Sequence, residues 1–277
     1  MATTTKNVVH VTTLTKPDSA DLFSMRLAGV AVDSRDNLYV LGDDRVLCFT
    51  PAYALDREMS VDGLGWSLLA EADTLWIGFD GRLSLYNAHG ELQNTIRDPG
   101  RLGRATAIAA AGGILVVADS TNRAVQRYSR EGKYLGELGA EANTRGFMIP
   151  NGVLDLVGDA SNQTILIAHP QKHRVERYES TGPLVAKWGR FGMHEPGDFG
   201  GCCNPTNIAV ATDGTIAVSE KAPPRVKLYG ANGEFQQVID QEVFDQNTKN
   251  IDLAFDSRNR LYATDPARRV VEVFQFE

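Results

Sequence analysis

The chain of 277 residues lacks the features that mark membrane and secreted proteins. No apolar run approaches the ~20 residues that are needed to cross a bilayer. The N-terminal segment, MATTTKNVVHVTTLTK, has no continuous apolar core of the kind found in signal peptides. We therefore expect no contact with a membrane and a cytoplasmic location, or export if a leader preceded the sequence given.

Excess positive charge is also lacking. The net charge is −7 and the isoelectric point is near 5.3, with the basic residues scattered along the chain. Nucleic-acid binding draws much of its affinity from basic residues that neutralise phosphates. The composition disfavours a nucleic-acid partner, and we expect a monomer that binds a small molecule or a protein.

Cysteine is scarce, and the common catalytic motifs are missing. Three cysteines cannot build a disulfide framework, and without a CxxC pair a structural zinc site is not expected. The sequence has no G-x-S-x-G, no glycine-rich phosphate loop and no H-E-x-x-H. No catalytic residue and no cofactor are predicted from motifs, and whether the protein is an enzyme stays open.

What the sequence does contain is a repeat. Six segments open on an aliphatic residue and close on an aromatic one, with an arginine four or five residues before the aromatic. The interval between opener and aromatic is 11 residues in the first two segments and 13 in the other four. The openers and aromatics are Leu38 and Phe49, Leu75 and Tyr86, Leu115 and Tyr128, Ile165 and Tyr178, Ile216 and Tyr229, and Leu261 and Phe274.

Each repeat contains short β-rich runs that are broken by Gly, Asp, Asn or Pro turns. Another short strand precedes each segment, and a weaker one follows all but the last. Four strands in about 46 residues are typical of a propeller blade, so we predict an all-β, six-bladed β-propeller that forms one domain over residues 1–277. The sixth repeat ends after its third strand, and residues 7–14, NVVHVTTL, have no other place. We predict that they supply the missing outer strand and close the ring, which removes free sheet edges.

The segments LVVADSTNRAVQRY, KHRVERY, WGRFGMHEPGDF and NIDLAFDSRNRLYATD resemble the repeats of NHL-type β-propellers. The resemblance covers nearly the whole chain and implies the six-bladed fold. It implies little about activity, because this family includes binding modules, RNA-binding domains and a few lyases.

In a propeller, the linkers between blades and the turns between second and third strands share one face, which is the usual ligand site. Four residues after the openers lie polar side chains that could ring the channel mouth: Asp119, His169, Glu220 and Asp265. These side chains could bind a polar ligand or a cation. They could equally accept hydrogen bonds from the turn that follows each of them.

A second set leads the innermost strands and includes Asn151, Asn207 and Asp252. Here the chain resembles six-bladed lactonases of the SMP-30/gluconolactonase type, which hold a divalent cation with a Glu, an Asn and an Asp. The resemblance implies a Ca²⁺ or other divalent site in the channel, and hence a metal-dependent hydrolase or lyase as the alternative function. The first repeat reads SMRLAG and offers no glutamate for such a site. For a zinc lyase, the five histidines show no ligand spacing.

Cys202 and Cys203 lie side by side in FGGCCNPTNIAV, on the same predicted face. Three interpretations stay open: two reduced thiols, one packed and one exposed; a strained disulfide between the neighbours; or a soft-metal site with His194. Cys48 is expected to be a small buried apolar residue. The leading hypothesis is a ligand-binding face that carries Cys202, Cys203 and Asn207 together with the four polar side chains near the openers.

Overall fold

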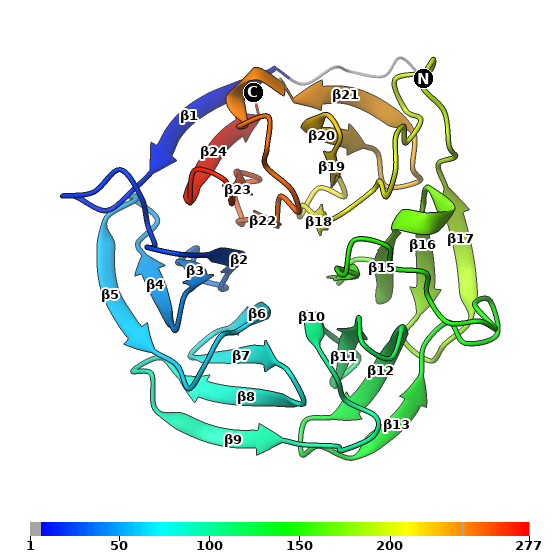
Figure 1. Cartoon of the computed structure of the whole chain (residues 1–277), viewed down its shortest axis with the longest axis horizontal. Helices are drawn as coiled ribbons and strands as arrows, with labels where there is room; N and C mark the ends of the chain where they lie inside the picture. Colours follow the sequence, from blue (N-terminus) through cyan, green and yellow to red (C-terminus); the bar gives the residue numbers. More distant parts are fainter. Residues whose placement is uncertain (1–6, 240, 277) are drawn as a thin grey trace.

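The computed structural model describes residues 7–239 and 241–276, which form six antiparallel four-stranded sheets around a central axis (Figure 1). The first three blades are β2(Leu27–Val32), β3(Leu38–Gly42), β4(Arg45–Phe49) and β5(Leu55–Ser60); β6(Ser67–Glu71), β7(Thr74–Phe79), β8(Arg82–Asn87) and β9(Leu92–Ile96); and β10(Ala105–Ala111), β11(Ile114–Asp119), β12(Ala124–Ser129) and β13(Tyr134–Glu137). The fourth and fifth are β14(Asp155–Asp159), β15(Thr164–His169), β16(Arg174–Glu179) and β17(Leu184–Trp188); and β18(Ile208–Val210), β19(Ile216–Lys221), β20(Pro224–Tyr229) and β21(Phe235–Ile239). The sixth blade is β22(Leu253–Phe255), β23(Leu261–Asp265), β24(Val270–Phe276) and β1(Val8–Leu14).

Helices are nearly absent. Within the described residues they are the two 3-10 turns η1(Pro170–Lys172) and η2(Gln241–Val243), and none is long and apolar enough to cross a membrane. The prediction of an all-β, six-bladed propeller is confirmed.

The sequence repeat has a direct structural cause. In every blade the aliphatic opener of the second strand pairs directly with the closing aromatic of the third strand, as Leu38 does with Phe49 and Ile165 with Tyr178. All twelve of these side chains are buried. The interval of 11 or 13 residues therefore measures the length of the hairpin between the two strands, and the cross-strand pair packs into the core between blades.

The repeated arginine acts at this hairpin. Arg123 Nε donates to the carbonyl of Phe147 at 3.1 Å, and Arg269 Nε donates to the carbonyl of Phe23 at 3.0 Å. Both carbonyls belong to linkers between blades, so these two arginines tie the hairpin of one blade to the linker that leads into the next. At these two positions a partly buried charged side chain is accommodated because its donors satisfy linker carbonyls. Arg174 and Arg225 instead pair with Glu176 and Glu220 of their own blades.

The ring is closed by the two ends of the chain. Strand β1 runs antiparallel to β24, with Val8 opposite Phe276 and Leu14 opposite Val271. In Figure 1, β1 occupies the outer position of the sixth blade, as β5, β9, β13, β17 and β21 do in the others. Leu14 is buried and packs into the apolar cluster shared by the sixth and first blades. The predicted closure by residues 7–14 is confirmed.

Closure predicts a global effect of a local deletion. Removing residues 1–14 takes away the outer strand and exposes the edge of β24, so the thermal transition should fall by more than 10 °C or lose cooperativity, on the order of several kcal/mol. Leu14→Ala should cost about 2–4 kcal/mol by leaving a core cavity, and Val9→Ala, at a side chain that is 38% exposed, should cost less than about 1 kcal/mol. A truncated protein that melts like the full chain would contradict this account.

Candidate functional site

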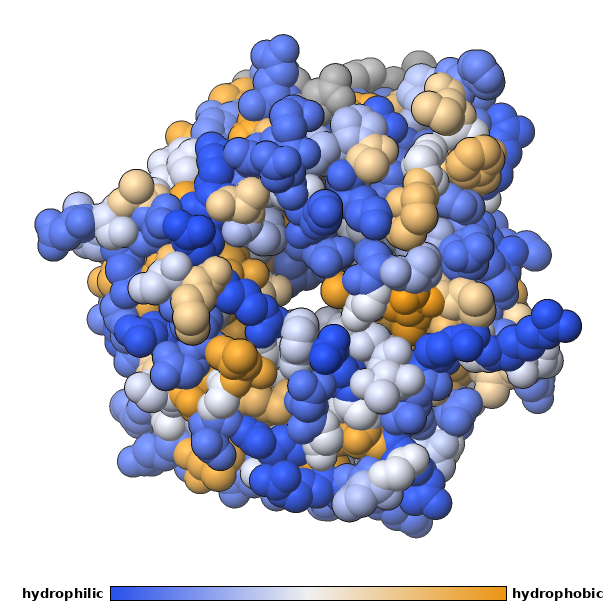
Figure 2. Space-filling model, in the orientation of Figure 1, coloured by the Kyte–Doolittle hydropathy of each residue, from blue (hydrophilic) through white to orange (hydrophobic). Residues whose placement is uncertain are grey.

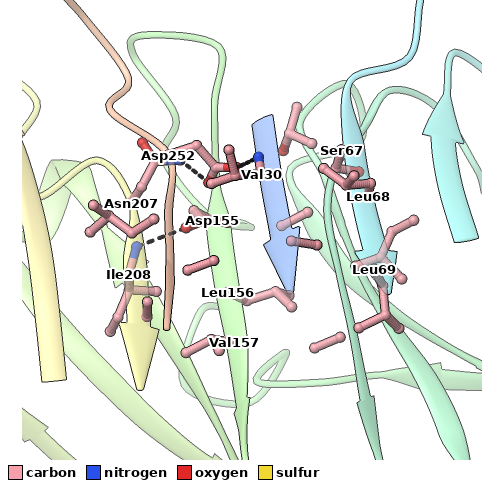
Figure 3. Close-up of a pocket in the computed structure, with 18 of the residues that line it drawn as sticks. Val30, Ser67, Leu68, Leu69, Asp155, Leu156, Val157, Asn207, Ile208 and Asp252 are labelled. Atoms are coloured by element: carbon pink, nitrogen blue, oxygen red, sulfur yellow. Dashed lines mark hydrogen bonds between the residues drawn. The ribbon is translucent and has the colours of Figure 1, made fainter. Parts of the chain in front are cut away.

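The innermost strands of the six blades surround a central cavity of about 450 Å³. An opening on the axis is visible in Figure 2. Most of the lining residues are apolar, and they come from β2, β6, β10, β14, β18 and β22 and from the linkers that precede these strands. Figure 3 shows Asp155, Asn207 and Asp252 toward one end of this wall and Leu69 and Val157 toward the other. The cavity therefore has a polar part and an apolar part along one axis.

Polar side chains at this end join neighbouring blades. Ile208 N–H donates to Asp155 Oδ2 at 2.8 Å, and Val30 N–H donates to Asp252 Oδ2 at 2.8 Å (Figure 3). Asn207 Nδ2 donates to Asp252 Oδ1 at 3.2 Å. These bonds link the fourth blade to the fifth, the fifth to the sixth, and the sixth to the first.

Two hydroxyl groups continue this pattern on the other side of the ring. Ser67 donates to the carbonyl of Ala105 at 2.8 Å, and Thr106 donates to the carbonyl of Leu154 at 2.7 Å. They link the second blade to the third and the third to the fourth. Gly29 of β2 lies at the junction between the sixth and first blades, where an added Cβ would lie 2.6 Å from Asp252 Oδ2. The missing side chain at Gly29 is what lets the Asp252 carboxylate reach the first blade.

The two carboxylates are held in an unfavourable environment for charge. Burial raises the pKa of Asp252 to about 6. Burial, and to a lesser extent the charge of Asp252, raises the pKa of Asp155 well above its ordinary value. Neither carboxylate forms an ion pair with a basic side chain of the described residues. Asn207, which is 96% buried, has an Oδ1 atom without a hydrogen-bond partner. The site thus offers uncompensated oxygen acceptors to whatever enters the cavity.

The sequence-predicted residues near the openers lie elsewhere. Asp119, His169, Glu220 and Asp265 are fully buried, and none of them lines the central cavity. Asp119 accepts from the backbone N–H groups of Gly103, Thr121 and Asn122, which is the turn chemistry given above as one of two interpretations. Asp265 accepts from Asp245 N–H and from Thr248 and Arg268. In the first blade, where Gly42 has the corresponding position, Asp43 accepts from three linker N–H groups.

His169 and Glu220 belong to buried charge clusters. His169 Nδ1 lies 3.3 Å from Glu176 Oε2, and burial lowers the pKa of this histidine. Glu220 pairs with Arg225 and with the fully buried Lys227, whose Nζ lies 3.1 Å away. Both residues are engaged with their own blade rather than aimed into the cavity.

The cysteine pair belongs to the linker before β18. All three cysteines are free thiols; Cys48 and Cys203 are buried and Cys202 is exposed. The pair therefore has the first of the three arrangements considered, one thiol packed and one exposed. Burial, and to a lesser extent a hydrogen bond with the neighbouring Cys202, raises the pKa of the Cys203 thiol. Neither residue lines the central cavity.

The next residue, Asn204, explains much of this linker. Its Nδ2 donates to the carbonyls of Gly200 and Ala222, and its Oδ1 accepts from Lys221 N–H. It therefore binds the linker to the β19–β20 hairpin. The same linker then delivers Asn207 into the cavity, so a structural anchor and a cavity residue lie three positions apart.

The predicted metal ligands are brought together only in part. Asn207 and Asp252 are hydrogen-bonded in the cavity, whereas Asn151 does not line it and donates its Nδ2 to Asn250 Oδ1 at 3.1 Å. No group of three His, Cys, Asp or Glu side chains is placed to hold a metal ion in the described part of the chain. Asn207 Oδ1 with the two carboxylates fits an oxygen-binding cation such as Ca²⁺; a set that includes Asn151 does not.

Asp155 was missed by the sequence reasoning. It lies four residues after Asn151 in PNGVLDL, at the start of an innermost strand, a place that Asp252 and Asn207 nearly share. An acidic residue inside an otherwise apolar inner strand was the available signal. Arg26 and Trp66, which also line the cavity, carried no signal in the repeat.

Comparisons with known proteins bear on the fold. No protein-family model and no curated protein matches the sequence. Among solved structures, the chain is similar to a catalytically inactive variant of virginiamycin B lyase from Staphylococcus aureus with quinupristin, with a TM-score of 0.63, 10% identity, and coverage of 90% of this chain and 80% of that one. A streptogramin B lyase structure matches with a TM-score of 0.63 and 10% identity over 100% of both chains.

The WD40 β-propeller domain of Doa1 matches as well, with a TM-score of 0.62, 14% identity, and coverage of 91% of this chain and 79% of that domain. At these identities the likeness shows the propeller fold and nothing about activity.

The raised pKa of Asp252 has a consequence for stability. The pKa in the folded state, about 6, lies above the ordinary value of 3.8, so the folded protein binds this proton more tightly than the unfolded chain does. The resulting stabilisation is present below about pH 4 and is lost as the pH rises to about 6. Asp252→Asn cannot bind this proton and lacks the stabilisation that the proton gives at low pH. Between pH 4 and 7 the free energy of unfolding of the variant, measured with urea, should therefore rise by about 1–3 kcal/mol relative to that of the native protein. Asp73→Asn, at a side chain that is 64% exposed, is the control; equal pH profiles for all three proteins would refute the assignment.

Proposed function

We propose that this protein is an NHL-type β-propeller that binds a small molecule in its central cavity, with a basic group of the ligand at Asp155, Asn207 and Asp252. One observation carries the proposal: two carboxylates with raised pKa values face the same cavity and have no basic partner among the described residues. A cationic group would compensate the charge that burial makes unfavourable. Carboxyl groups with strongly perturbed pKa values, when they line a cavity, cluster at functional sites.

The hydrogen bonds between blades do not compete with this role. A carboxylate has about four acceptor sites. The N–H of Ile208 uses one on Asp155, and the N–H of Val30 and Nδ2 of Asn207 use two on Asp252. These bonds orient the carboxylates from both sides of the ring. The apolar wall beside them would pack against the uncharged part of a ligand, as in other small-molecule sites.

The proposal predicts a pH-dependent affinity for amines. With n-hexylammonium as the probe, calorimetry should detect binding in the millimolar range at pH 7.5. Affinity should fall about tenfold at pH 5, because Asp252, with a pKa of about 6, is then mostly protonated. Asp252→Asn and Asp155→Asn keep the shape of the site and should each weaken binding by about tenfold or more.

Asp119→Asn is the matched control, because Asp119 is a buried carboxylate of the same ring that does not line the cavity. Its affinity for the probe should equal that of the native protein. If Asp119→Asn lost binding of the probe while Asp252→Asn kept it, the binding site would lie at the polar side chains that follow the openers. The proposal of a site in the central cavity would then be wrong.

A metal-dependent hydrolase or lyase is the second candidate, supported by the open Asn207 Oδ1 beside two carboxylates. Oxygen ligands of this kind suit Ca²⁺. Elemental analysis after purification with and without added Ca²⁺, Mg²⁺ or Zn²⁺ separates the two candidates. One equivalent of metal that is lost in Asp252→Asn would favour the enzyme; no metal after supplementation would favour the binding protein.

A further inference from the structure

Arg26 lies at the mouth of the cavity, directly before β2, and its guanidinium stacks on Trp66 with 4.0 Å between Cζ and the ring centroid. Arg104 stacks on the same indole, with its Cζ at 4.1 Å from the centroid. Trp66 is also held by Asp80, which accepts from Trp66 Nε1 at 3.4 Å. The mouth thus contains a rigid stack of two guanidinium groups and one indole.

The two arginines differ in how their charge is balanced. Arg104 Nε donates to Asp80 Oδ1 at 3.1 Å, so this arginine is paired, and it does not line the cavity. The side chain of Arg26 makes no hydrogen bond or ion pair with the described residues, and it does line the cavity. Burial, and to a lesser extent the charge of Arg104, lowers the pKa of Arg26, and the charges of Asp80 and Asp43 offset this only in part. Lys249, also on the cavity lining and exposed, adds positive charge at this end.

A stacked, half-buried guanidinium with unused donors is well suited to a planar anion. Arginine presents its N–H groups in a flat fork that matches a carboxylate, and stacking on an aromatic ring holds the fork in one orientation. The anion would compensate the charge of Arg26 in the same way that a basic group would compensate Asp155 and Asp252 in the same cavity. The cavity therefore has opposite unbalanced charges at two places.

We infer that the ligand is dipolar, with a carboxylate bound by Arg26 at the mouth and a basic group bound at Asp155 and Asp252. The position of the basic group rests on the proposed function; the anion subsite at Arg26 does not. Arg26 precedes Val30, whose N–H donates to Asp252, by four positions, and a bulge between Leu27 and Gly29 interrupts the strand. Roughly 13 Å of extended chain is therefore an upper limit on the separation of the two subsites along the strand. A ligand that bridges them carries its charges at its two ends, as an ω-amino acid or a short peptide does.

The probes that test this inference are glycine, γ-aminobutyrate, ε-aminohexanoate, n-hexylammonium and hexanoate, titrated by calorimetry at pH 7.5. ε-Aminohexanoate should bind about tenfold more tightly than n-hexylammonium, because one charge-assisted bidentate contact is added. Glycine and γ-aminobutyrate should bind more weakly than ε-aminohexanoate, because they bury less apolar chain in the cavity. Arg26→Gln should reduce the affinity for ε-aminohexanoate to that for n-hexylammonium and leave the latter unchanged.

Arg104→Gln is the matched control, since it removes the other guanidinium of the stack. It should leave the preference for the amino carboxylate intact, and the thermal melts of both variants show whether they are folded. The inference is overturned if the carboxylate of ε-aminohexanoate adds no affinity, or if Arg104→Gln abolishes the preference for ε-aminohexanoate as Arg26→Gln does. In both cases, binding of n-hexylammonium would still support the proposed function. Binding of hexanoate without binding of n-hexylammonium would instead reject the basic subsite, and the dipolar ligand with it.

Discussion

The pairing of β1 with β24 is the constraint on which the rest of the molecule depends. Each blade buries its faces only against its two neighbours, so a ring with one open junction would expose apolar surface on both sides of the gap. The antiparallel register from Val8 to Leu14 joins the first described strand of the chain to the last one. Leu14 carries this closure into the core cluster of the first and sixth blades. The central cavity exists because the inner strands are held in a closed circle.

Inside that circle, the fold repeats but the chemistry does not. Junctions near the second and third blades use the hydroxyl groups of Ser67 and Thr106 to bond the next blade. Junctions near the fourth to sixth blades use Asp155, Asn207 and Asp252 for the same purpose. A hydroxyl or an amide would suffice to join strands, and it would cost less on burial than a carboxylate. The acidic side of the ring therefore calls for a reason beyond architecture.

The fold was predictable from the sequence because its determinants are local and repeated. The opener and the aromatic of each repeat are cross-strand partners, so a spacing in the sequence reports a contact in space. The site was predictable only in part. Asn207 and Asp252 were found by their place before inner strands, but Asp155 stands in an apolar run, and the pairing of these three depends on three separate blades. The polar residues after the openers had a strong sequence signal for a local reason, the turn that each of them caps, as Asp119 does.

Arg26 and Trp66 show the same limit from the other side. Nothing in the repeat pattern distinguishes them, because the stack joins the linker of the first blade to that of the second, and Arg104 enters from the third. A guanidinium on one linker meets its indole only when neighbouring blades have packed side by side. Function in such a fold is therefore expected where the repeat is broken, since side chains that serve the repeat, such as the arginines of the hairpins, already have their acceptors within it. Arg26, Asp155 and Asp252 form no ion pair with the described residues, and all three line the central cavity.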